Sequence, residues 1–151
     1  MPVPTNTLQG TTYNNVTDVA QGGSLLSTIV SPTVGGIQGG VGYQPPTANT
    51  VTQLTNKSTG VTLNAYSGTI TMNNASLANA TAVAFTLTNS CIGVRDVISY
   101  SFKSGNTASS YILTTDAVAL GSCSISLYNF TGGSLSEAVV FNYIVLKGSN
   151  V

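Results

Sequence analysis

Three carboxylates, Asp96, Asp116 and Glu137, are the side chains after residue 50 that are best suited to acid–base chemistry. Two of them held at a defined separation could cleave a glycosidic bond. Nothing in their spacing requires two of them to converge: Asp96 stands at the entrance of a predicted strand, Asp116 falls in a predicted loop and Glu137 opens the last predicted strand. A calcium site made from Asp116 and backbone carbonyls is an equally unsupported alternative.

Histidine, the usual general base and the commonest metal ligand, does not occur in the chain. The glycine-rich stretches lack the spacing and the following Lys-Ser/Thr of a phosphate-binding loop. We therefore expect no catalytic residues, no metal site and no cofactor, and we expect that the protein is not an enzyme.

The two cysteines are predicted to be reduced, buried thiols. Cys91 continues the inward face of a predicted strand at Val83–Asn89, and Cys123 lies on the inward face of another at Ser122–Asn129. Thiols on inward faces usually act as small hydrophobic groups. A disulfide formed after release from the cell is the alternative. A catalytic thiol is disfavoured because no histidine is present to activate it.

Charged residues make up only 5% of the 151-residue chain, and the net charge is zero. Four scattered cations cannot form a basic patch, which argues against nucleic acid as a partner. The longest apolar stretches are far too short to span a membrane, and the N-terminus lacks the pattern of a secretory signal. We expect a protein made in a cytoplasm, with a weakly self-repelling surface suited to permanent association.

The chain divides near residue 50 into two regions of different composition. All five prolines and half of the 16 glycines lie before that point. Residues 1–50 show no sustained period, and Leu25–Val30 (LLSTIV) is their one apolar cluster. A flexible tail is the simpler interpretation. The apolar residues favour an extended arm that wraps a partner subunit, with these candidate contact residues: Leu25, Leu26, Ile29, Val30, Val34, Ile37, Val41 and Tyr43.

Residues 51–151 alternate apolar and polar side chains with a period of two, the pattern of half-buried strands. Seven or eight short strands with frequent turns predict an all-β domain, an antiparallel β-sandwich of immunoglobulin-like or jelly-roll type. Leu77–Ala80 is predicted to form a helical turn, and residues 104–107 a hairpin connection. The candidate strands are Val51–Leu54, Val61–Ala65, Gly68–Met72, Val83–Asn89, Asp96–Lys103, Ser110–Thr114, Ser122–Asn129 and Glu137–Lys147.

The last candidate strand, Glu137–Lys147, is apolar on both faces. Such a strand is expected at the centre of a sandwich or under a contact between subunits. In the second case we expect it to supply a contact between subunits through Val139, Phe141, Tyr143 and Val145.

From Lys57 to Gly148 the chain resembles a family of structural proteins of tailed-bacteriophage virions. The resemblance is carried by KSTGVTLN at Lys57–Asn64, by SGTITMNNASLANATAVAFTLTNS at Ser67–Ser90 and by GGSLSEAVVFNYIVLKG at Gly132–Gly148. Related β-domains occur as capsid decoration (cement) proteins and as modules of tail or fibre proteins, and no catalytic residues accompany them.

The resemblance implies a protein made in a bacterial cytoplasm and placed on the capsid surface of a virion. It would be bound to the major capsid protein through the arm residues given above and assembled as a homotrimer. A tail, collar or fibre component with host-surface binding is the alternative. A carbohydrate-binding or hydrolytic module is a third hypothesis, and exposed tyrosines would have to serve it.

Overall fold

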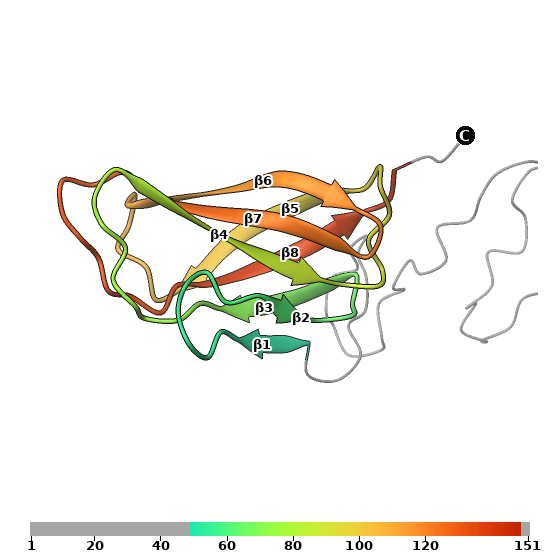
Figure 1. Ribbon diagram of the computed structural model, residues 1–151, viewed down its shortest axis with the longest axis horizontal. Helices are drawn as coiled ribbons and strands as arrows, with labels where there is room; N and C mark the ends of the chain where they lie inside the picture. The colour runs from blue at the N-terminus through green and yellow to red at the C-terminus, as the bar shows by residue number, and fades with distance from the viewer. Residues whose placement is uncertain (1–48, 149–151) are drawn as a thin grey trace, which may run out of the picture. The chain divides into compact units, whose positions relative to one another are not determined.

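The computed structural model describes residues 49–148, which form a β-sandwich without helices (Figure 1). One sheet has the strand order β1-β3-β8-β5 and the other the order β2-β4-β7-β6. The predicted all-β sandwich is therefore confirmed. The strands are β1 (Thr50–Thr52), β2 (Val61–Thr62), β3 (Ser67–Thr71), β4 (Thr81–Thr88), β5 (Val97–Ser104), β6 (Tyr111–Ala119), β7 (Ser122–Asn129) and β8 (Val140–Leu146). The candidate arm contacts at positions 25 to 43 lie outside the described residues.

Both sheets are mixed. The pairs β1/β3 and β2/β4 are parallel, and the other four pairs are antiparallel. Between β1 and β4 each successive strand lies in the opposite sheet. Strands β1 and β3 therefore run in the same direction within one sheet, and β2 and β4 do so within the other. The parallel pairs distinguish this order from the purely antiparallel sheets of immunoglobulin and jelly-roll domains.

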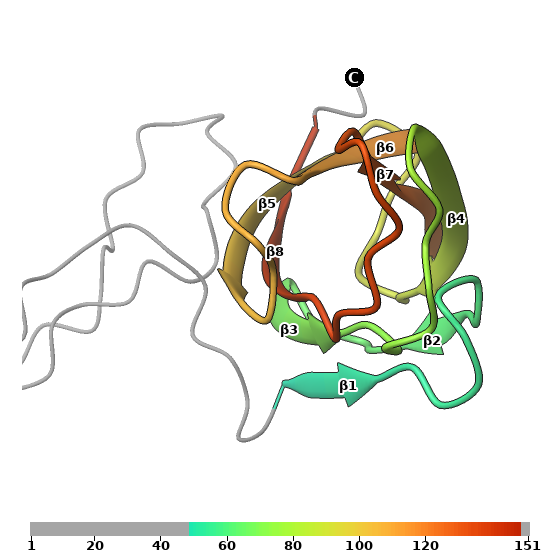
Figure 2. The same cartoon turned by 90° about the vertical axis from the view of Figure 1, so that its left-hand side faces the viewer.

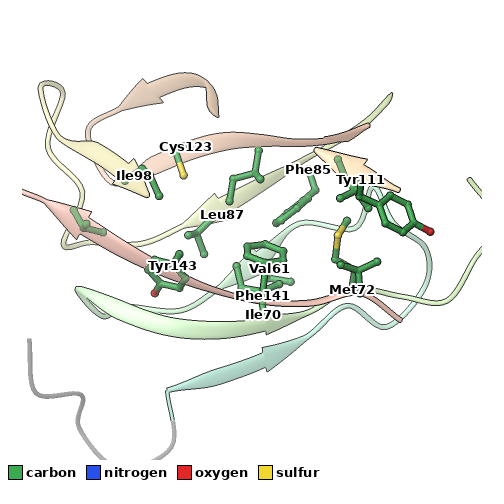
Figure 3. Packing of buried hydrophobic residues seen from close by; sticks show 14 of the residues in the cluster. Val61, Ile70, Met72, Phe85, Leu87, Ile98, Tyr111, Cys123, Phe141 and Tyr143 are labelled. Carbon is green, nitrogen blue, oxygen red and sulfur yellow. The ribbon is translucent and has the colours of Figure 1, made fainter. Parts of the chain in front are cut away.

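The core lies between the sheets and is formed by the alternate residues of each long strand. On β7 the pattern is strict: Cys123, Ile125 and Leu127 are buried, and the residues between them are partly exposed. Figure 3 shows Phe85 of β4 and Phe141 of β8 facing each other across the core, with ring centroids 6.5 Å apart. Burial of these apolar side chains is the main source of stability.

The strand β8 is apolar on both faces, but the predicted subunit-contact residues face the core. Val139, Phe141 and Val145 are fully buried, and Tyr143 is 2% exposed. Their packing partners belong to the same chain, so this face has no surface left for a second subunit. The prediction that these four residues form a contact between subunits is wrong for this reason. The opposite face of β8 is the accessible one.

Three local predictions fail where the chain makes tertiary contacts. Residues 104–107 do not close a hairpin, because β5 and β6 belong to different sheets. Asp116 lies within β6, which continues to Ala119. Leu77 is not helical and instead forms an antiparallel bridge with Leu135, so this segment is held by a distant loop.

Buried polar side chains fasten the loops at both ends of the sandwich. At one end the Asn129 amide donates to the carbonyls of Leu77, Ala78 and Gly133. At the other end the Asn89 amide donates to the carbonyl of Ala65. Such groups satisfy backbone carbonyls that would otherwise be buried without partners. The domain is thus a closed unit whose loops are fixed to its strands.

Candidate functional site

An open groove of about 450 Å³ lies between β5 and β6. We call it the edge groove. Phe102 and Ile112 are its most exposed apolar side chains, at 37% and 48%. Ile98 and Tyr111 are buried and form its floor. No charged side chain is among the residues that line it: Ile98, Ser99, Tyr100, Phe102, Tyr111, Ile112 and Leu113.

The edge groove exists because β5 and β6 are each the last strand of their sheet. Figure 2, viewed along the sandwich, shows these two strands next to each other on one side and β1 and β2 on the opposite side. The outer edge of a sheet presents backbone N–H and C=O groups that have no strand partner. The site is therefore both apolar and capable of forming backbone hydrogen bonds.

Each of the two edge strands carries a β-bulge. The ladder between β5 and β8 shifts at Lys103, and the ladder between β6 and β7 shifts at Asp116. In both strands the residue without a cross-strand partner is charged and exposed. Charges and bulges protect sheet edges from uncontrolled pairing. They leave regular edges at Val97–Phe102 and Tyr111–Thr115, the stretches that line the groove.

A side-chain bridge crosses the groove. The hydroxyl groups of Tyr100 and Thr115 are 2.7 Å apart. Burial raises the pKa of the Tyr100 phenol well above its ordinary value, although its hydrogen bond to Thr115 acts in the opposite direction. The phenol therefore stays neutral at physiological pH and serves as a hydrogen-bonding group. Its ring packs edge-to-face on Phe141, with centroids 5.8 Å apart.

The three carboxylates do not meet. Asp96 and Glu137 lie at opposite ends of β5: Asp96 precedes its first residue, and Glu137 accepts hydrogen bonds from Thr107 beyond its last residue. Asp116 lies on the outer face of the other sheet, where it accepts hydrogen bonds from Thr114 and Ser126. Each carboxylate of the described residues thus holds local structure, and no two of them face a common site.

The two cysteines are both free thiols. Cys123 is buried in the core, and Cys91 is half-buried in the loop after β4. Burial raises the pKa of the Cys123 thiol to about 11, against a smaller opposing effect of its hydrogen bond with Tyr100. Cys123 is therefore protonated at neutral pH, which suits a packing role rather than a nucleophile.

Sequence reasoning missed the buried polar residues. Lys57 is only 2% exposed, and its ammonium donates to the backbone carbonyls of Asn73 and Glu137. Burial lowers the pKa of this amine, while the charge of Glu137 opposes the shift. Asn129, which opens a glycosylation-like Asn-Phe-Thr sequence, is fully buried and bonded on both sides of its amide. Neither residue carries a sequence signal beyond its polar type.

The accessible face of β8 carries a small apolar area. Val97 and Leu146 are paired directly across β5 and β8, and they are 59% and 47% exposed. Val94, in the loop that leads to β5, is also 59% exposed. The rest of this face is mainly Ser, Thr and Asn, so it is a mixed surface rather than a continuous apolar patch.

Within residues 49–148 there is no cluster of three or more His, Cys, Asp or Glu side chains that could hold a metal ion. The same part of the chain contains no helix of the length and hydrophobicity needed to cross a membrane. Comparison with protein-family models, with curated proteins and with solved structures finds no match to this chain.

Proposed function

We propose that the chain is a structural protein of a tailed-bacteriophage particle, and specifically a capsid decoration (cement) protein. The resemblance of Lys57–Gly148 to virion structural proteins is the starting point. Two observations together support the proposal most strongly. The buried amides of Asn89 and Asn129 hold the loops at both ends of the domain by hydrogen bonds, and an uncharged edge groove lies along its side. Such a domain combines fixed loops with an uncharged surface, as a decoration role requires.

In this proposal the protein acts by binding the shell and stabilising it mechanically. The sandwich binds the assembled shell, and the apolar arm lies along subunits of the major capsid protein. A protein that binds only the assembled state stabilises that state by mass action. Many copies on one shell make weak individual contacts collectively strong. A nearly uncharged surface suits this use because neighbouring copies repel one another weakly.

Quantitative mass spectrometry of purified particles tests the proposal. Peptides of this chain are measured against peptides of the major capsid protein, with isotope-labelled standards for both. A decoration protein occurs in a number of the same order as the capsid subunits. A few copies per particle, or none, would contradict the proposal.

Immunogold labelling of intact particles gives the position independently. Antibodies against the full chain should label the head across its surface. Label confined to the tail or collar would replace the decoration role with the tail-component alternative. Particles from which the gene is deleted supply the control for nonspecific label.

A further inference from the structure

We propose that the edge groove binds the segment Leu25–Val30 from a neighbouring copy of the same chain. In this arrangement the LLSTIV segment lies as an added strand over the mouth of the groove, outside the Tyr100–Thr115 bridge, so the copies join by exchange of their arms. Addition of an extended segment to a free sheet edge is a common mode of protein recognition. The inference concerns the assembly of the protein itself and does not depend on the proposed function.

The groove and the segment match in length. Each edge strand is regular from its first residue to its bulge. In β5 this stretch is Val97–Phe102, and in β6 it is Tyr111–Thr115. An extended chain rises about 3.4 Å per residue, so these edges accept about five or six residues. Leu25–Val30 has six residues and is flanked by Ser24 and by Ser31-Pro32. Proline cannot donate to a sheet, so the pairing would end there.

The groove and the segment also match in chemistry. The lining of the groove is apolar or hydroxylic and contains no charge. The segment is likewise uncharged, with Leu25 and Ile29 in one phase and Leu26 and Val30 in the other. The side chains of one phase of the segment would cover the exposed Phe102 and Ile112. The backbone of the segment would pair with the free edge of a groove strand. No other stretch of residues 1–48 combines four large aliphatic residues in six positions.

The donor is a neighbouring copy because of where the arm enters the domain. Residue 49 leads into β1, which is the edge of its sheet farthest from β5. The described chain therefore begins on the side of the sandwich opposite the groove, so a neighbouring copy is the more direct donor. The intervening residues 31–48 span up to about 60 Å when extended, so they can bridge two copies. Exchange of identical elements is a low-cost route to closed oligomers.

The remaining apolar residues of the arm stay available for other contacts. Val34, Ile37, Val41 and Tyr43 lie beyond the inserted segment and before the domain. They can contact a capsid subunit while Leu25–Val30 joins the copies. Self-association and shell binding can therefore succeed or fail separately, and each has its own experiment.

Photocrosslinking of the full chain in solution tests the inference. Ile112 is replaced by p-benzoylphenylalanine in unlabelled protein, which is unfolded and refolded together with ¹⁵N-labelled wild-type protein. Illumination should join position 112 to labelled peptides that contain residues 25–30. Crosslinks only to the unlabelled arm would show insertion within one chain and overturn the inference. Crosslinks to other segments, or none, would also overturn it.

The oligomeric state provides a second readout. Sedimentation velocity of the full chain should show an oligomer that dissociates when Ile112→Asp is introduced or when Ile29→Asp is combined with Val30→Asp. We expect each change to weaken association at least about tenfold, since it places a charge in an apolar contact. Leu120→Asp, at a residue 80% exposed in the turn between β6 and β7, is the control and should leave the oligomer intact. A wild-type chain that stays monomeric would contradict the inference.

Discussion

The hydroxyl groups of Tyr100 on β5 and Thr115 on β6 lie 2.7 Å apart and join the two sheets at their outer edges. On the opposite side of the sandwich, β1 and β2 are in contact, whereas on this side the side-chain bridge crosses an open groove. The bridge therefore fixes the separation of the two edge strands. It also sits next to the Cys123 thiol, so it links the groove to the core.

Loss of this bridge should destabilise the domain modestly. Tyr100→Phe keeps the ring that packs on Phe141 and removes only the hydroxyl, so we expect a loss of about 1 kcal/mol in the free energy of unfolding. Thr115→Val should cost a similar amount. The double variant should cost less than the sum of the two, as measured by urea denaturation. Strict additivity would show that the two hydroxyls do not interact.

The Asp96–Lys147 ion pair should make stability depend on pH in the acidic range. Burial alone would raise the pKa of Asp96, but hydrogen bonds from the Lys147 ammonium and from the N–H groups of Gly93 and Gly148 outweigh burial and lower it. A carboxylate whose folded pKa is below its unfolded value of about 3.9 stabilises the protein above that value. This contribution is lost as the pH falls through the folded pKa.

Asp96→Asn tests that pH dependence. The variant should be about 2–3 kcal/mol less stable than wild type at pH near 7, because an amide replaces a charged acceptor of three hydrogen bonds. The difference should shrink toward zero below the folded pKa, where Asp96 is protonated. Urea midpoints measured across the acidic range give the result. A difference that stays constant with pH would refute the role of the charge.

The Asn129 amide should be the most sensitive polar group at the loop end. Its nitrogen donates to the carbonyls of Leu77, Ala78 and Gly133. Asn129→Asp would replace this donor with a carboxylate oxygen, which can only accept and would face three carbonyl oxygens. We expect a loss of about 3 kcal/mol or more in thermal or urea unfolding. Asn142→Asp is the matched control: Asn142 is exposed and its oxygen already accepts from Thr69, so little should change. Equal effects of the two changes would count against this assignment.

The two thiols should differ in reactivity. Cys123 is 2% exposed with a pKa raised to about 11 by burial, whereas Cys91 is half-buried near the surface. Iodoacetamide at about pH 8 should modify Cys91 first and reach Cys123 only after unfolding. Peptide mass spectrometry follows both sites, and Cys91→Ser serves as the control. Equal modification of both thiols in the folded protein would contradict the structure.

The strands could be predicted from the sequence because burial alternates with a period of two. Val83, Phe85 and Leu87 share a face in the sequence pattern and point into the core of the structure. The pairing of strands could not be predicted in the same way. Residues 104–107 have the composition of a hairpin turn, and only the sheet order shows that they connect two sheets.

The edge groove was also beyond the sequence pattern. The period of two places Ile98, Tyr100 and Phe102 on one face of the predicted strand Asp96–Lys103, but the sequence of a strand does not reveal whether that strand ends a sheet. The buried amine of Lys57 is a similar case, since lysine is ordinarily a surface residue. Its position follows from loop contacts with Asn73 and Glu137 that are distant in the sequence.

A cryo-electron density map of the intact phage particle tests the central claim most directly. We expect sandwich-shaped density at many symmetry-related positions on the outer surface of the head, with extended density of the arm along the major capsid protein. A head surface without such density, or the domain confined to the tail, would contradict the account.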